Sequence, residues 1–98
     1  MKYYNYICVL NNLNMRTKIT SQTFSHRFNQ VNATLIVEGE TISGYSRDPD
    51  IIDKLEREGE YLQGLCELYE DVLKGQDYDC DYVEYQIENG EAVFYIVS

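Results

Sequence analysis

The segment from Asp48 to Gly75 constrains the fold of this chain more than any other stretch. Asp48-Pro49-Asp50 is typical of a helix start, with an acidic N-cap, proline at the first helical position and a second acid near the positive end of the helix dipole. Apolar side chains then recur at helical spacing, namely Ile51, Leu55, Leu62, Leu65, Tyr69, Val72 and Leu73. Gly75 is the expected stop. We therefore predict one long amphipathic helix over about 49–74.

Two glycines interrupt this helical pattern. Gly59 and Gly64 each cost about 1 kcal/mol relative to alanine inside a helix. Gly59 falls on the apolar stripe, where it would let the helix approach a sheet closely, or it marks a break between two shorter helices. The sequence leaves both interpretations open.

The first third of the chain is less decided. Residues 2–10 are rich in Tyr, Ile and Val and predict a strand, followed by a loop over 11–14. In residues 16–31, alternate side chains could line one face of a strand. The later part also fits a short helix, because Phe24 and Phe28 are at helical spacing. We predict a strand through about residue 22 and leave the rest open.

Two hairpins are predicted on either side of the helix. Segments 33–38 and 41–45 flank Gly39-Glu40, and a glycine at the first loop position is typical of a type II′ turn. Asn89-Gly90 predicts a type I′ turn near the C-terminus. Counting outward from that turn, the cross-strand pairs are Glu88 with Glu91, Ile87 with Ala92, Tyr85 with Phe94, and Val83 with Ile96.

These elements predict an α+β fold in a single domain, residues 1–98. It comprises an antiparallel sheet, the long helix packed on one face, and a C-terminal β-hairpin. The 98 residues are enough to bury one modest core without metal or disulfide support.

Charge is distributed unevenly along the chain. The net charge is −9. Residues 1–47 hold two acids and five bases, whereas residues 48–98 hold fifteen acids and three bases. Because phosphates would be repelled by the second half, this distribution favours a protein partner with a basic surface and no direct nucleic-acid partner.

The motifs of common enzyme and metal sites are absent from the sequence. His26 is the only histidine, and there is no glycine-rich phosphate loop. Cys8, Cys66 and Cys80 have no zinc or redox spacing. The acids from Asp77 onward resemble a calcium loop, but Tyr82 stands where that loop needs glycine. We expect a cytoplasmic protein with no catalytic residue, metal or cofactor, and with no membrane-spanning segment.

Regularly spaced carboxylates are the main candidate for function. Asp77, Asp79 and Asp81 would lie about 7 Å apart on one side of an extended segment, from a rise of about 3.3 Å per residue. Glu56, Glu60 and Glu67 lie on the polar ridge of the predicted helix. Both spacings are of the order of successive phosphates along a nucleic-acid strand. We predict these six residues to be partner-binding.

Small size, the acidic second half, tyrosine-rich strands and an asparagine-rich start resemble small phage-encoded inhibitors, the anti-CRISPR proteins. The resemblance covers overall character and carries over no motif. It implies a non-catalytic nucleic-acid mimic that occupies the basic groove of a CRISPR effector nuclease in the host cytoplasm. The alternative is an immunity protein, antitoxin or dimeric adaptor that binds through a tyrosine-rich apolar surface, since the chain has ten Tyr against three Phe. A homodimer is compatible with either.

Overall fold

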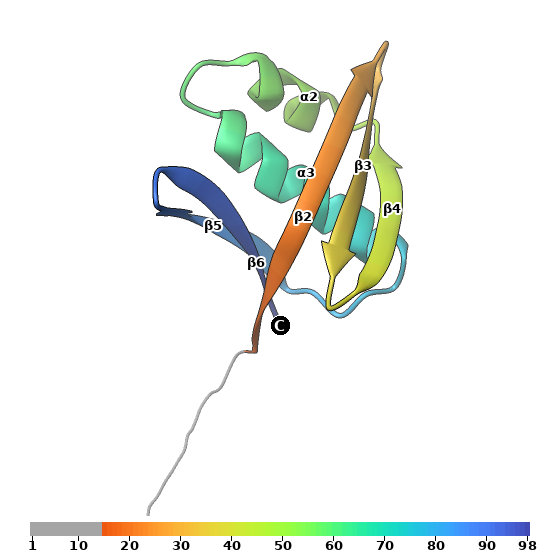
Figure 1. Ribbon diagram of the computed structural model, residues 1–98. Helices are drawn as coiled ribbons and strands as arrows, with labels where there is room; N and C mark the ends of the chain where they lie inside the picture. The colour runs from red at the N-terminus through yellow and green to blue at the C-terminus, as the bar shows by residue number, and fades with distance from the viewer. Residues whose placement is uncertain (1–14) are drawn as a thin grey trace, which may run out of the picture.

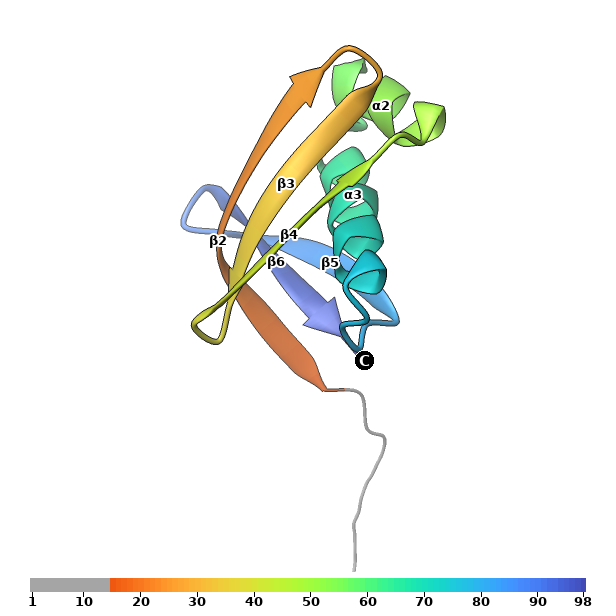
Figure 2. The same cartoon turned by 90° about the vertical axis from the view of Figure 1, so that its right-hand side faces the viewer.

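The computed structural model describes residues 15–98; the predicted strand over 2–10, the loop after it and Cys8 lie outside them. The predicted α+β class is confirmed. Both helices lie on one face of an antiparallel sheet (Figures 1 and 2). In chain order the elements are β2 (Arg16–Arg27), β3 (Gln30–Val37), β4 (Glu40–Ser46), α2 (Pro49–Glu56), α3 (Tyr61–Gly75), β5 (Tyr82–Glu88) and β6 (Glu91–Val97).

The long strand β2 joins the two halves of the sheet. The strand order is β4-β3-β2-β6-β5. The first residues of β2, from Arg16 to Lys18, pair with β6, and its remainder pairs with β3. The register between β2 and β3 shifts by one residue at Thr20, whose hydroxyl donates a hydrogen bond to the Ile36 carbonyl at 3.0 Å. The strand predicted through about residue 22 therefore continues to Arg27, because β3 pairs with it along that length.

The first predicted hairpin exists, but its loop was assigned one residue too far along the chain. Val37 pairs with Glu40, so the loop is Glu38-Gly39 and not Gly39-Glu40. Both loop residues have positive φ, 50° at Glu38 and 82° at Gly39. That combination is typical of a type I′ turn, which matches the right-handed twist of the flanking strands.

The C-terminal hairpin is confirmed in every predicted pair. Asn89 and Gly90 have φ of 52° and 82°, and the four predicted pairs are present between β5 and β6. The pairs Val83–Ile96, Tyr85–Phe94 and Ile87–Ala92 put six apolar side chains on one face. Val83, Phe94 and Ile96 are buried and Ala92 is half-buried, whereas Tyr85 and Ile87 are exposed. The hairpin thus extends beyond the helix that covers its base.

The prediction of one long helix is wrong: the chain forms α2 and α3 with a bend between them. Gly59 lies in the bend with φ of 90°, and a Cβ added there would have no neighbour within 4 Å. Gly59 therefore allows the turn and not a close approach to the sheet. The close approach occurs at Gly64, where an added Cβ would lie 3.1 Å from Lys54 Cβ. Gly64 thereby lets α2 pack against α3.

The predicted end of the helix is also displaced. Gly75 is the last residue of α3, and the left-handed residue beyond it is Asp77, with φ of 56°. The Tyr78 amide donates to the Leu73 carbonyl at 2.9 Å, the six-to-one bond of a Schellman motif. Aspartate tolerates the left-handed conformation better than most residues, so Asp77 provides the stop that was expected of glycine. The start at Asp48 is confirmed, since its carboxylate accepts from the Asp50 amide at 2.9 Å.

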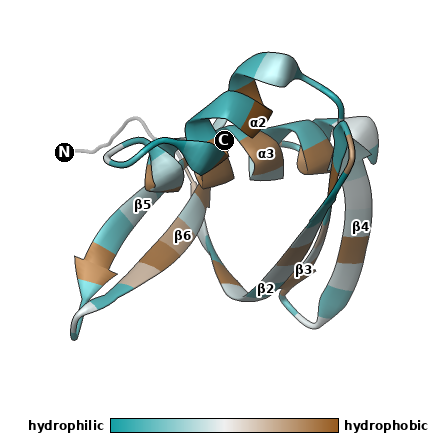
Figure 3. Ribbon diagram, turned by 90° about the horizontal axis from the view of Figure 1, so that it is seen from above, coloured by the Kyte–Doolittle hydropathy of each residue, from teal (hydrophilic) through white to brown (hydrophobic). Residues whose placement is uncertain are grey.

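The core lies between α3 and the inward sides of the strands, where apolar segments of helices and sheet face one another (Figure 3). Alternate residues of β3 point into it and are fully buried. The rings of Tyr69 and Phe94 form an edge-to-face pair, with ring centroids 5.1 Å apart and planes at 85°. This pair joins α3 to the C-terminal hairpin.

We expect Gly59→Ala to lower the free energy of unfolding by about 1–2 kcal/mol, because alanine must adopt the left-handed φ at the bend. Gly75→Ala is the matched control: it lies within α3, and an added Cβ has nothing within 4 Å. There the higher helix propensity of alanine should leave stability unchanged or raise it by up to about 1 kcal/mol. Urea denaturation of both variants checks this, and equal effects would contradict the assignment of the bend to Gly59.

Candidate interaction surfaces

Asp77, Asp79 and Asp81 lie together beyond the C-terminal end of α3. All three are exposed, whereas Tyr78 and Cys80 between them pack against the core. The Asp81 amide donates to the Val97 carbonyl at 2.8 Å, which holds the end of this segment against β6. The predicted alternation is thus present up to Cys80, and the three carboxylates are directed to solvent.

The fold adds two carboxylates that the sequence prediction missed. Burial raises the pKa of the Tyr78 phenol above its ordinary value. Three nearby carboxylates raise this pKa further, those of Glu38, Glu40 and Asp79. The β3–β4 turn therefore places its two glutamates at the same end of the molecule as the aspartates. We call this set of five the acidic end: Glu38, Glu40, Asp77, Asp79 and Asp81.

The acidic end is not neutralised by the rest of the described chain. None of its five carboxylates forms an ion pair with a side chain in residues 15–98. Like charges this close repel one another, so the arrangement costs stability when the protein is alone. A cationic partner would remove that cost.

The carboxylates predicted on the helix ridge are placed differently. Glu67 Oε2 lies 2.7 Å from Lys54 Nζ, and Glu60 lies 3.0 Å from Arg57 Nη1. Glu56 is the most exposed of the three, with His26 Nδ1 3.8 Å away. Glu56 and Glu60 flank the bend before α3, and α3 is about 22 Å long at 1.5 Å per residue. The six predicted residues therefore do not form one patch: these two lie at the opposite end of α3 from the acidic end.

Glu67 joins the two helices. The hydrogen bond from Lys54 lowers the pKa of the Glu67 carboxyl, a second hydrogen bond from Gln63 lowers it further, and the same contact with Glu67 raises the pKa of Lys54. Lys54 belongs to α2 and Glu67 to α3. The Glu67 carboxylate is thus engaged in a contact within the protein, although Glu67 was predicted from the sequence to bind a partner.

We expect Glu67→Gln to lower the free energy of unfolding by about 1 kcal/mol at pH 7. Because the fold lowers the pKa of Glu67, its contribution is present above the ordinary value of 4.5 and is lost as the pH falls below it. The difference between parent and variant should therefore shrink toward zero near pH 3. Glu56→Gln is the control and should change stability by less than about 0.5 kcal/mol at either pH. Urea titrations at pH 7 and pH 3 measure both, and a pH-independent difference would contradict the ion pair.

The groups that enzymes use are dispersed or held in structural contacts. Burial raises the pKa of the Cys66 thiol to about 12, so this thiol is not a ready nucleophile at neutral pH. His26 Nε2 donates to the Phe28 carbonyl at 2.9 Å within the β2–β3 turn. In residues 15–98, no three His, Cys, Asp or Glu side chains gather as metal ligands.

An apolar surface lies where the bend between the helices meets the exposed part of the C-terminal hairpin. Tyr61 and Tyr85 are each 42% exposed and border a hollow of about 290 Å³. Phe24 of β2 approaches Tyr61, with ring centroids 6.2 Å apart. Ile87, 59% exposed, lies on the same face of the hairpin as Tyr85. This apolar surface consists of Phe24, Tyr61, Tyr85 and Ile87.

Comparison with protein-family models, curated proteins and solved structures finds no match to this chain. Neither helix within residues 15–98 has the length and apolar composition needed to cross a membrane.

Proposed function

We propose that this protein is a non-catalytic inhibitor whose acidic end occupies the basic groove of a nucleic-acid-binding protein. The observation that carries the proposal is the gathering of five exposed carboxylates without an ion pair to any described residue. Elsewhere in the described chain, Asp53, Glu60 and Glu67 are paired with Arg57 or Lys54. A group of exposed charges gathered at one end is suited to recognition of a cationic surface.

The spacing of the acidic end suits a groove that normally holds a phosphate backbone. Alternate residues of an extended chain lie about 7 Å apart, the order of spacing expected between Asp79 and Asp81, whereas Asp77 has a left-handed backbone and falls outside this pitch. Carboxylates at that pitch can contact the same lysine and arginine side chains that hold successive phosphates. Docking would release the counterions of the groove, so affinity should fall steeply as salt rises.

The resemblance to anti-CRISPR proteins suggests the class of target. A CRISPR effector nuclease holds its guide and target strands in positively charged channels and reads a short adjacent motif with arginine side chains. An acidic protein lodged there would prevent DNA recognition without any chemistry of its own. The proposed place of action is the cytoplasm of the infected bacterium.

A pull-down tests the proposal. Tagged parent and the Asp77→Asn/Asp79→Asn/Asp81→Asn variant are incubated with lysate from bacteria that express an active CRISPR system, then washed at 50 mM and 500 mM salt. We expect the parent alone to retain a nucleic-acid-binding protein, and only at low salt. Asparagine tolerates the left-handed backbone at position 77, so the variant should fold.

A different result would favour the second candidate, a binding module that uses the apolar surface. Its support is the exposure of two tyrosines and Ile87 beside a hollow, since aromatic side chains are enriched in protein interfaces. A partner held equally by parent and variant at both salt concentrations would rule out the acidic end. Loss of that partner on Tyr85→Ala would then assign binding to the apolar surface.

A further inference from the structure

A polar, acid-free face lies on the side of β2, β3 and β4 that is turned away from the helices. We call it the outer face. Strand pairing places its side chains in rows that run across the three strands. In the row nearest the β2–β3 turn, Arg27 lies opposite Gln30, whose side chain accepts a hydrogen bond from Arg47. In the next row, Asn32 lies opposite Tyr45. The two rows after that carry Ser, Thr and Ile side chains and no acid. The outer face thus differs sharply from the rest of this acidic protein.

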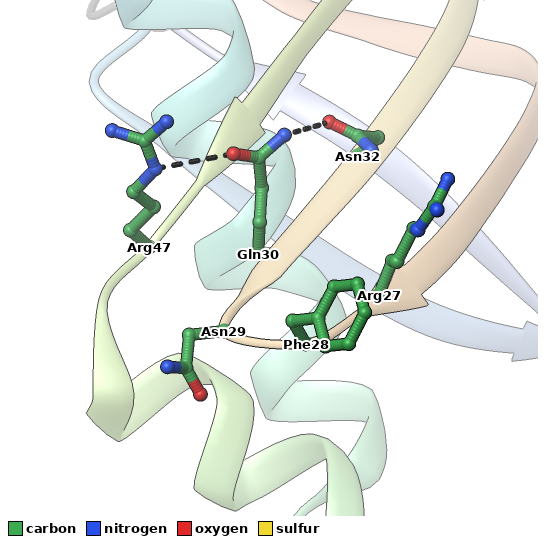
Figure 4. A pocket seen from close by; sticks show the side chains of 6 residues that line it. All are labelled: Arg27, Phe28, Asn29, Gln30, Asn32 and Arg47. Carbon is green, nitrogen blue, oxygen red and sulfur yellow. Dashed lines mark hydrogen bonds between the residues drawn. The ribbon is translucent and has the colours of Figure 1, made fainter.

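The rim of the outer face at the β2–β3 turn forms a basic hollow of about 450 Å³ (Figure 4). Arg47 Nε donates to Gln30 Oε1 at 3.1 Å, and Gln30 Nε2 donates to Asn32 Oδ1 at 2.9 Å. Neither Arg27 nor Arg47 forms an ion pair with a side chain in residues 15–98. Two guanidinium groups are therefore available to an anion, beside amides that can bond to its polar edges.

Aromatic rings stand beside both arginines. The Arg47 guanidinium lies 5.0 Å from the centroid of the Tyr45 ring, and that of Arg27 lies 5.6 Å from the centroid of the Phe28 ring. Tyr45 is 52% exposed and Phe28 is 85% exposed. In proteins that bind single-stranded nucleic acids, aromatic rings stack on the bases, and the arginines beside them hold the phosphates.

Phe28 has a backbone conformation that is unfavourable for a bulky residue. It is the first of two loop residues and has φ of 57°. A bulky side chain in the left-handed region costs about 1–2 kcal/mol. Asn29, the second loop residue, does not share the positive φ, and two-residue turns with positive φ at the first position alone, type II′, favour glycine there. The exposed ring gains no burial that would offset the strain. An exposed ring at such a strained position points to a contact with a binding partner.

Charge elsewhere in the molecule permits an anionic ligand at this face. The acidic end begins at the other end of β3, about 23 Å away at 3.3 Å per residue, which exceeds the screening length of about 8 Å at physiological salt. Three acids lie near Arg47. Asp48, the next residue, caps α2 by accepting from the Asp50 amide. Asp53 and Glu56 of α2 line a second hollow with Arg47, where Asp53 is held by Arg57 and Glu56 lies beside His26.

We propose that the outer face binds a single-stranded nucleic acid. Arg27 and Arg47 contact its phosphates, and Phe28 and Tyr45 stack on its bases. The proposal is at odds with the sequence expectation of no direct nucleic-acid partner, which rested on the charge of the second half of the chain. The proposal does not rest on the proposed function, which uses the opposite end of the molecule.

Fluorescence anisotropy with labelled 12-nucleotide single strands of DNA and RNA tests this. We expect saturable binding by the full chain at 25 mM salt. The Arg27→Gln/Arg47→Gln variant should bind more weakly, and the slope of log affinity against log salt should become shallower by about 1.4, or about 0.7 for each phosphate that is no longer neutralised. Arg16→Gln, which removes an arginine paired with Glu84 at the other end of β2, is the control and should bind like the parent.

Phe28→Gly separates binding from folding. Glycine accepts the positive φ, so this variant should be as thermally stable as the parent or more so, yet it should bind single strands about tenfold more weakly. Absence of binding by the parent, or equal binding by all variants, would overturn the proposal. So would an aspartate-rich peptide that displaces the oligonucleotide at equal concentration, because the arginines would then recognise acidic protein and not nucleic acid.

Discussion

Replacing Phe94 with alanine is expected to lower the free energy of unfolding by about 3–5 kcal/mol. Phe94 lies on β6, is 2% exposed, and forms an edge-to-face pair with the Tyr69 ring. Its removal leaves a cavity where α3, β5 and β6 meet and removes the aromatic pair as well. Because domains of this size are stable by only about 5–15 kcal/mol, the variant should be partly unfolded at 37 °C. Urea denaturation followed by circular dichroism measures the loss.

Phe24→Ala is the matched control for this prediction. Phe24 is also a sheet phenylalanine that contacts a tyrosine, but it is 37% exposed. We expect it to cost no more than about 1 kcal/mol. Equal losses for the two variants would mean that the C-terminal hairpin is not anchored to α3 through Phe94.

Neutralising the whole acidic end is expected to have the largest effect on binding. In the proposed complex, replacing its glutamates with glutamine and its aspartates with asparagine should weaken affinity on the order of 100-fold at 50 mM salt. The reason is that each of the five carboxylates contributes about 0.5 kcal/mol even at an exposed site. Stability should stay the same or rise, since the variant removes mutual repulsion. Titration calorimetry against the captured partner gives the affinity, and thermal denaturation gives the stability.

The position of the charge should matter as well as its amount. A control variant, Glu56→Gln/Glu58→Gln/Glu91→Gln, removes as many charges as the three-aspartate variant but leaves the acidic end intact. We expect it to bind within about threefold of the parent, through loss of long-range attraction alone. An equal loss for the two triple variants would show that net charge, and not the acidic end, determines affinity.

The parts of the fold that short-range signals determine were predictable. Asn89-Gly90 specified the C-terminal hairpin and its register because that dipeptide readily adopts positive φ at both positions. Glu38 has the same backbone conformation with a residue type that does not indicate it, so the loop of the first hairpin was misplaced by one residue. The extent of β2 beyond residue 22 was left open because Phe24 and Phe28 also fit helical spacing, and the pairing with β3 that decides it is not a local signal.

The candidate site was predictable to a similar degree. Asp77, Asp79 and Asp81 are close in the sequence, so their grouping needed only an extended segment. Glu38 and Glu40 join them through the position of a distant turn, which no local pattern reveals. The involvement of Glu67 with Lys54 depends on the packing of α2 against α3, which follows from the bend and the close approach at Gly64.

Competition at the target tests the central claim most directly. The partner captured by the parent protein is loaded with its labelled nucleic acid, and increasing amounts of the inhibitor are added at constant salt. If the acidic end occupies the nucleic-acid groove, the parent should displace the strand fully, at concentrations that track its own affinity, and the neutralised variant should not. Simultaneous binding of inhibitor and nucleic acid, with unchanged affinity for each, would contradict mimicry.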